Sequence, residues 1–382
     1  MYFCTVFWTA EIVNHLCMAF SPRLAHVCLV LFAAAEAWPA ATATDCFTDL
    51  AAFQRDLSPA VAAALAAAPK QYRQIEPSLF HLAAAHAERI TSLPGDEQVA
   101  LLVKLARFID AKRQAEGNRT VIGQGRAIIG LLDPDRGLDP KEILAVAKAY
   151  GADATIFKRD EEGETIRSVA DGFLAAVSRS ARGTAPTTIV VLGHGLPRQI
   201  QSYRIPVDRL AHALLPPVEA AADTPVDLGH LVLICDDCYS ADFSLNLAAA
   251  IEAACRSRGL VLVSTPTLIA GTNRDCVGHA DFGEKFVPHF WKDVIELFYI
   301  RRPHPPAITL RDFFEKVDNM MYGYGRAASV SADGTVSYRL VDAEQCQDPV
   351  VFVPLSPADR AALREILGLP ADASLPAILD IG

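Results

Sequence analysis

Two segments, TTIVVLGHG at 187–195 and LVLICDDCYS at 231–240, decide the fold class of this chain. Each contains an unbroken apolar run, IVVL at 189–192 and LVLIC at 231–235, which is typical of a strand buried on both faces of a parallel sheet. Each run ends in Gly, Asp or Ser, which indicates a turn. His194 and Cys238 lie 44 residues apart, and this leaves room for one crossover helix between neighbouring parallel strands.

The same alternation of strand and helix patterns continues along the chain after residue 119. We therefore predict an α/β fold, with a mostly parallel sheet and helices on both faces. Asp333-Gly334 indicates a hairpin within 330–341, and Ser356-Pro357 indicates the start of a short C-terminal helix. The strands are expected at 120–130, 154–157, 187–192, 231–234 and 260–264, and the helices at 141–150, 165–180, 207–215, 243–257 and 286–298.

The N-terminus has the pattern of an export signal. An apolar run at 27–35 follows Arg23, and Ala41-Thr42-Ala43 is a small-residue cleavage site, so the mature chain is expected to begin near Thr44. Met18 is favoured as the true initiator, because it gives a short basic segment directly before the apolar run. Two alternatives remain open: an uncleaved N-terminal anchor, and lipid attachment at Cys46, which Asp45 disfavours. All three imply an exported protein, periplasmic or secreted, with no stable membrane span after signal removal.

Four regions are expected along the chain. Residues 1–43 are the signal peptide, 44–118 a helical N-terminal region, 119–355 the α/β domain and 356–382 a C-terminal helical tail. The second region is Ala-rich and has apolar residues at helical spacing, with a break at Pro94-Gly95.

Composition limits the classes of partner and cofactor. The 382 residues are 51% hydrophobic, and their formal net charge of −10 comes without any basic block, so a nucleic-acid partner is disfavoured. Gly123-x-Gly125 lacks the spacing of a dinucleotide fingerprint, and no ligand spacing indicates a metal. We therefore predict no cofactor. The six cysteines beyond the signal are too scattered for a stapled scaffold: Cys46, Cys235, Cys238, Cys255, Cys276 and Cys346.

Reactive residues follow the two deciding strands. Ligands of open α/β sheets bind at the carboxyl ends of the strands, where His194 and Cys238 are expected to meet. An imidazole beside a thiol lowers the pKa of the thiol or accepts its proton. We predict Cys238 as nucleophile and His194 as acid/base, with the N–H groups of Gly195 and Cys238 as the oxyanion hole. Asp237 either orients a partner or starts a turn.

This pattern resembles the caspase and legumain superfamily of cysteine peptidases, nearest to its bacterial legumain-like or caspase-like members. The resemblance covers about 120–298 and rests on an apolar strand followed by His194-Gly195, and on a second strand ending in Asp236-Asp237-Cys238-Tyr239-Ser240. It implies a caspase-like sheet, a Cys–His dyad and a protein or peptide substrate cleaved through a thioester. Weaker likenesses are the strand at 260–264 and GHADFGEKFVPHF at 278–290. Ala241 departs from the family, where glycine is frequent.

Alternatives remain at this site. The Cys235-x-x-Cys238 spacing at a strand-to-helix junction also fits a thiol-disulfide oxidoreductase, and Thr265-Pro266-Thr267 resembles the proline turn of that class. A catalytically inactive caspase-like interaction module is a further alternative. His279, in the loop after the next predicted strand, ranks second as the base, whereas His230 is expected near the opposite edge of the sheet.

Overall fold

The computed structural model describes residues 75–122, 126–133, 144, 152–159, 165–272, 308–311, 324–330, 336–342 and 350–381. The chain divides into two compact units, Met1–Gln54 and Arg55–Gly382, and every described residue belongs to the second. In the described part of the chain, no helix has both the length and the apolar character needed to cross a membrane. Several predicted features lie outside the described residues: the signal segment 1–43 with Met18, the helices at 141–150 (apart from Leu144) and 286–298, and Cys46, Cys276, His279 and Cys346.

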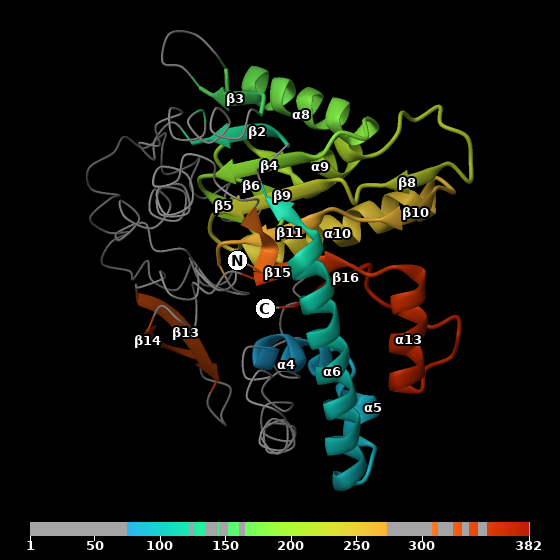
Figure 1. The fold of residues 1–382 in the computed structure, drawn as a ribbon. Helices are drawn as coiled ribbons and strands as arrows, with labels where there is room; N and C mark the ends of the chain where they lie inside the picture. The colour runs from blue at the N-terminus through green and yellow to red at the C-terminus, as the bar shows by residue number, and fades with distance from the viewer. Residues whose placement is uncertain are drawn as a thin grey trace, which may run out of the picture. The chain divides into compact units, whose positions relative to one another are not determined.

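The central sheet has seven strands in the order β16-β15-β11-β9-β4-β2-β3 (Figure 1). Only β15 runs against the others, because both of its neighbours pair with it antiparallel while the remaining pairs are parallel. The predicted α/β class and mostly parallel sheet are thereby confirmed. The strands are β2 (Ala127–Leu132), β3 (Ala154–Lys158), β4 (Thr187–Leu192), β9 (Leu231–Asp236), β11 (Thr267–Ala270), β15 (Val350–Pro354) and β16 (Ile378–Asp380).

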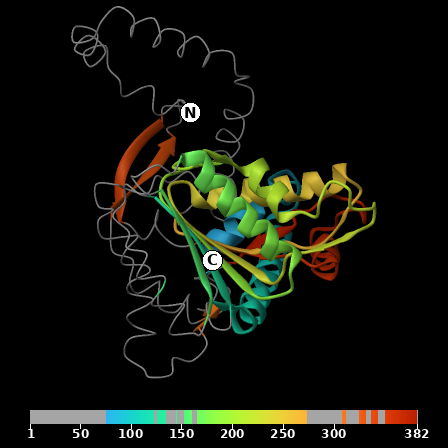
Figure 2. The same ribbon diagram turned by 90° about the horizontal axis from the view of Figure 1, so that it is seen from above.

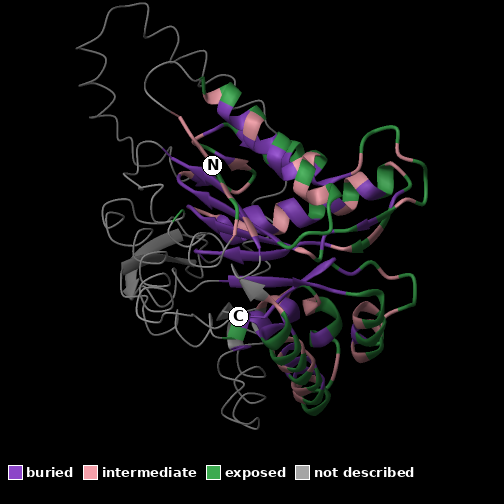
Figure 3. Ribbon diagram, turned by 45° about the horizontal axis from the view of Figure 1, so that its top comes forward, coloured by how far each residue is buried: buried purple, intermediate pink, exposed green. Residues whose placement is uncertain are grey.

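One face of the sheet packs against three amphipathic helices, α8 (Ile166–Arg182), α9 (Val207–Leu214) and α10 (Ser240–Ser257). Alternate strand residues such as Leu231, Leu233 and Cys235 enter the same buried cluster as these helices. Every residue of β4 and of β9 is buried, so these two strands are covered on both faces. Figures 2 and 3 show the buried sheet between two layers of helices.

The second face is covered by the N-terminal helices together with the last helix of the chain. These are α4 (Glu76–Ala84), α5 (Ala87–Thr91), α6 (Gly95–Arg119) and α13 (Pro357–Leu367). The break at Pro94-Gly95 is confirmed, because α6 begins at Gly95 with Pro94 as its N-cap. Helix α4 is joined to β16 at Asp380, whose carboxylate accepts a hydrogen bond from Ser78 at 2.9 Å and lies 3.0 Å from the ring of His81.

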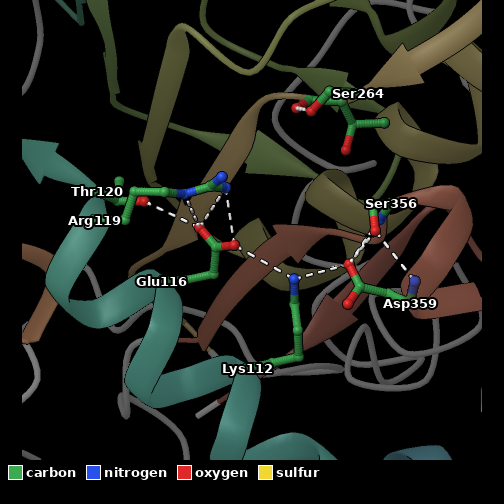
Figure 4. Close-up of polar contacts among 8 residues, drawn as sticks. Lys112, Glu116, Arg119, Thr120, Ser264, Ser356 and Asp359 are labelled. Carbon is green, nitrogen blue, oxygen red and sulfur yellow. Dashed lines mark hydrogen bonds and ion pairs between the residues drawn. The ribbon is translucent and has the colours of Figure 1, made fainter. Parts of the chain in front are cut away.

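A network of charged groups joins α6 to α13 (Figure 4). The Lys112 ammonium lies 2.9 Å from the Asp359 carboxylate and 3.3 Å from Glu116, which in turn pairs with Arg119. Ser356 and Asp359 form a capping box at the start of α13. Burial raises the pKa of Asp359, but hydrogen bonds from Ser356 and Lys112 outweigh burial, so the net effect is a lowered pKa. Helices α6 and α13, which are far apart in the sequence, are thus held together by partly buried charges.

Three predicted elements differ from the structure. The segment expected as a sheet strand at 260–264 forms β10 (Val261–Ser264), which pairs with β8 (Pro225–Asp227) outside the central sheet. The place beside β9 belongs to β11, because all four of its residues are buried whereas Val261 and Val263 are 48% and 39% exposed. The strand expected at 120–130 is divided into β1 (Val121–Ile122), paired with β12 (Ile308–Thr309), and β2. Helix α10 begins at Ser240 rather than at 243, because the turn before it is only three residues long.

Other predicted elements are confirmed. Helices α8 and α9 lie within two residues of their expected bounds, and α13 begins at Pro357, where Ser356-Pro357 indicates a helix start. The hairpin consists of β13 (Tyr324–Val330) and β14 (Val336–Asp342), which pair antiparallel on either side of Asp333-Gly334. The chain that leaves β4 forms a small antiparallel sheet of β5 (Gly195–Leu196), β6 (Gln199–Ile200) and β7 (Ile205–Pro206).

Candidate active site

His194 and Cys238 lie at the carboxyl ends of two neighbouring parallel strands. Strands β4 and β9 pair in a register that sets Leu192 opposite Asp236, and each candidate residue follows two positions later. The Gly193 N–H lies 3.5 Å from the Asp236 carbonyl oxygen, just beyond the paired strand ends. The predicted neighbourhood of these two strands is therefore confirmed, and both residues emerge at the same edge of the sheet.

Cys238 lies in a tight turn between β9 and α10. Tyr239 has φ 58° and ψ 27°, the left-handed region that non-glycine residues rarely adopt, and α10 begins at the next residue. Because the turn is short, the half-buried Cys238 lies two residues before the helix. The N-terminus of α10 is therefore close to the thiol, where a helix favours negative charge.

Thr272, which follows β11, holds this turn in place. Its hydroxyl donates to the Asp237 carbonyl oxygen at 3.1 Å and accepts the Ser240 N–H at 3.0 Å. Its own N–H donates to the Ser240 hydroxyl at 2.9 Å. Sequence reasoning missed Thr272 and Ser240, because the strand that brings Thr272 to this turn, β11, was not among the predicted strands.

Gly195 packs directly against the turn that carries Cys238. An ideal Cβ at this position would lie 2.4 Å from the Asp237 carboxylate and 2.6 Å from the Cys238 carbonyl oxygen, so no side chain fits here. In the β5–β6 ladder, the His194 carbonyl accepts the Gln201 N–H at 2.8 Å, which makes Gly195 and Ile200 the next, non-hydrogen-bonded pair. The Gly195 N–H therefore points away from β6.

The two aspartates before Cys238 are buried against glycines of the flanking segments. Asp236 and Asp237 are 2% and 4% exposed. The Asp237 carboxylate lies against Gly195, on the side of the histidine, and the Asp236 carboxylate lies against Gly271, on the side of β11. Asp237 thus belongs to the same contact that joins the His-Gly segment to the cysteine turn.

A hydrogen-bonded chain positions the backbone of His194, whose side chain is half-buried. The His194 N–H donates to the Ser202 hydroxyl at 3.0 Å, and that hydroxyl donates to the carboxylate of Asp133 in a short hydrogen bond. The Asp133 N–H in turn donates to the Leu192 carbonyl at 2.9 Å. Sequence reasoning missed Asp133 and Ser202, which the β2 end and the β6–β7 turn bring to the histidine.

The two cysteines of the C-x-x-C segment have different environments. Cys235, Cys238 and Cys255 each carry a thiol rather than a disulfide. Cys235 lies inside the hydrophobic cluster, and burial, followed by the nearby charges of Asp237 and Asp236, raises its pKa well above the ordinary value. A thiol held protonated in the core is unreactive, whereas Cys238 is partly accessible.

His230 lies at the amino end of β9, as predicted. Its ring nitrogen is 3.0 Å from the Ser180 carbonyl, and its own carbonyl accepts a hydrogen bond from Arg126 at 2.6 Å. It is therefore separated from Cys238 by the length of the strand. Over the described residues, no group of three or more His, Cys, Asp or Glu side chains could hold a metal ion.

A cavity of about 250 Å³ opens beside His194. Its back is held by Tyr203, whose hydroxyl donates to the Leu132 carbonyl at 2.5 Å and accepts the Arg159 N–H at 3.1 Å. The sequence contains no recognisable pocket motif, because the lining comes from five separate places in the chain: Asp133, Arg159, Ile166, His194, and Gln201, Ser202 and Tyr203.

The arrangement can support attack by a thiol with proton transfer by an imidazole at one sheet edge. The assignment of roles rests on this geometry. Comparisons of the chain with models of protein families, with curated proteins and with solved structures found no match.

Proposed function

We propose that this protein is a cysteine endopeptidase with Cys238 as nucleophile and His194 as general acid and base. The observation that carries the proposal is the register of β4 and β9, which brings the His-Gly and Cys segments to the same sheet edge. The contact of Gly195 with the Asp237–Cys238 backbone supports it further, because this contact leaves no space for a side chain between the two segments.

In the proposed reaction, the Cys238 thiolate attacks the carbonyl carbon of the peptide bond and His194 holds the thiol proton. The Gly195 N–H, which points away from β6, and the Cys238 N–H donate to the developing oxyanion. His194 then protonates the leaving nitrogen, and a thioester joins the acyl part to Cys238. Water, deprotonated by His194, hydrolyses the thioester and restores the thiol. The start of α10 favours the thiolate before attack.

The proposal includes a caspase-like domain over 119–355, of the caspase and legumain type. Its support is the mostly parallel sheet, six of whose seven strands lie in this range, with the dyad residues at the ends of adjacent strands. A protein or peptide substrate and an exported location follow from the same proposal and from the N-terminal signal pattern.

The environment of Cys235 argues against the oxidoreductase alternative. A C-x-x-C reductase needs one thiol to attack and the other to resolve the mixed disulfide. Cys235 is fully buried and its raised pKa keeps it protonated. The oxidoreductase alternative gives no reason for His194 to lie at the same sheet edge as Cys238. An inactive interaction module gives no reason for it either.

Three variants test the proposal. Cys238→Ala and His194→Ala should each abolish cleavage of a peptide library while circular dichroism stays unchanged, and Cys235→Ser should keep most of the activity. Mapping the cysteine labelled by a thiol-reactive peptide-like probe should identify Cys238. Disulfide-reductase activity that needs Cys235 and Cys238 but not His194 would replace the peptidase proposal with the oxidoreductase.

A further inference from the structure

The cavity beside His194 has a defined place along the carboxyl edge of the sheet. The strand order β9-β4-β2-β3 sets the order of the residues that follow these strands: Cys238, His194, Asp133 and Arg159. The cavity is lined by the last three of these residues but not by Cys238. It therefore lies on the side of His194 that faces away from the thiol.

We propose that this cavity binds the residue that follows the cleaved bond, and that it selects a polar side chain there. The inference rests on the proposed peptidase function. The carbonyl carbon must lie against the Cys238 sulfur, and the leaving nitrogen must come within hydrogen-bonding reach of His194. The chain beyond that nitrogen then continues past the imidazole, away from the thiol and toward the cavity.

The size of the cavity fits one residue. Sites for drug-sized ligands occupy roughly 300–1,000 Å³, and this cavity of about 250 Å³ falls below that range. The base of the cavity is also firm, because Tyr203 is 2% exposed and bonds to the ends of both β2 and β3. A firm, small cavity can discriminate between side chains of similar length.

The lining combines opposite charges. Asp133 is 2% exposed and already accepts the Ser202 hydroxyl, and Arg159 forms a second part of the wall. No ion pair of Arg159 occurs among the described residues. A side chain with both a donor and an acceptor can add a hydrogen bond to Asp133 and accept one from Arg159, and the carboxamides of Gln and Asn have both groups. An apolar side chain would offer the Arg159 guanidinium no acceptor inside the cavity.

The test uses fluorescence-quenched peptides built on a sequence that the wild-type protein cleaves, differing only in the residue after the cleaved bond. The expected kcat/KM for Gln exceeds that for Leu by about tenfold or more, since a pocket with buried polar groups rejects a side chain that cannot pair with them. Arg159→Gln removes the cation at similar size. It should lower the ratio of kcat/KM for Glu relative to Lys by about tenfold, and Arg159→Lys should restore that ratio.

Arg198→Ala is the matched control, because Arg198 is an exposed arginine in the neighbouring β5–β6 turn that does not line the cavity. Its Glu-to-Lys ratio should equal that of the wild-type protein. Equal rates for Gln and Leu, or an unchanged Glu-to-Lys ratio in folded Arg159→Gln, would refute the subsite.

A second probe separates failure of the subsite from failure of the proposed function. A peptidyl acyloxymethyl ketone carries only residues that precede the cleaved bond, so its reaction with Cys238 should be the same in Arg159→Gln and wild type. If the probe labels Cys238 and peptides are cleaved with no preference for the residue after the cleaved bond, the peptidase proposal stands and the subsite is refuted. Absence of both labelling and cleavage would overturn the peptidase, and the subsite with it.

Discussion

Gly195→Ala tests the contact between the histidine segment and the cysteine turn. The added Cβ would lie 2.4 Å from the Asp237 carboxylate and 2.6 Å from the Cys238 carbonyl, whereas ordinary contacts begin at 3.4 Å. One of the two segments must therefore move by about 1 Å, and a displacement of that size at a catalytic group costs about 100-fold in rate. Crowding of a packed site also costs about 1–3 kcal/mol of stability.

The assay measures kcat/KM on a cleaved peptide, together with the free energy of unfolding in urea. We expect a loss of about 100-fold or more in kcat/KM in a protein that remains folded. Gly95→Ala is the matched control, because nothing lies within 4 Å of an added Cβ there, and it should keep full activity. Gly195→Ala with activity within about threefold of wild type would refute the contact as a requirement for catalysis.

Three further predictions follow from other contacts. Ser202→Ala removes the link between Asp133 and the His194 N–H, so kcat/KM on a cleaved peptide should fall about tenfold, and Ser202→Thr should recover part of it. Lys112→Met leaves buried Glu116 without this cation and should lower the free energy of unfolding by about 2–3 kcal/mol at pH 7, as urea titration would show. The pKa of Asp359 is lowered, so the stability that its contacts supply is complete above the ordinary aspartate pKa of 3.8 and is lost as pH falls through the lower pKa of the folded state. In urea titrations over that pH range, the free energy of unfolding of Lys112→Met should therefore fall less than that of the wild-type protein. N-terminal sequencing of exported protein should find a start near Thr44, and a mature cytoplasmic protein starting at Met1 would contradict the export signal.

The core strands could be predicted because their apolar residues indicate burial on both faces. Residues 189–192 and 231–235 form unbroken apolar runs, and a strand with that pattern must be covered on both faces. The order of the two strands and the place of His194 and Cys238 at one edge then followed from the general geometry of parallel sheets.

The strand beside β9 could not be predicted, because two candidates of equal apolar character follow each other closely. VLVS at 261–264 and TLIA at 267–270 have similar strand propensity. What separates them is whether both faces are covered, and that depends on the helices and strands that pack on them. Only β11 is buried at every position, so it takes the central place and β10 forms a ribbon with β8.

The supporting residues of the site were beyond sequence reasoning for a related reason. Asp133 lies 61 residues before His194, and Thr272 lies 34 residues after Cys238, so no local spacing joins them. They meet the dyad segments because β2 and β11 flank β4 and β9 in the sheet. The two outer strands thus supply the groups that hold the backbone of the two inner ones: Asp133 acts through Ser202 on His194, and Thr272 acts on the turn of Cys238. If the peptidase proposal holds, catalytic geometry depends on four adjacent strand ends rather than two. Variants at the outer pair should then lower kcat without touching the nucleophile or the base.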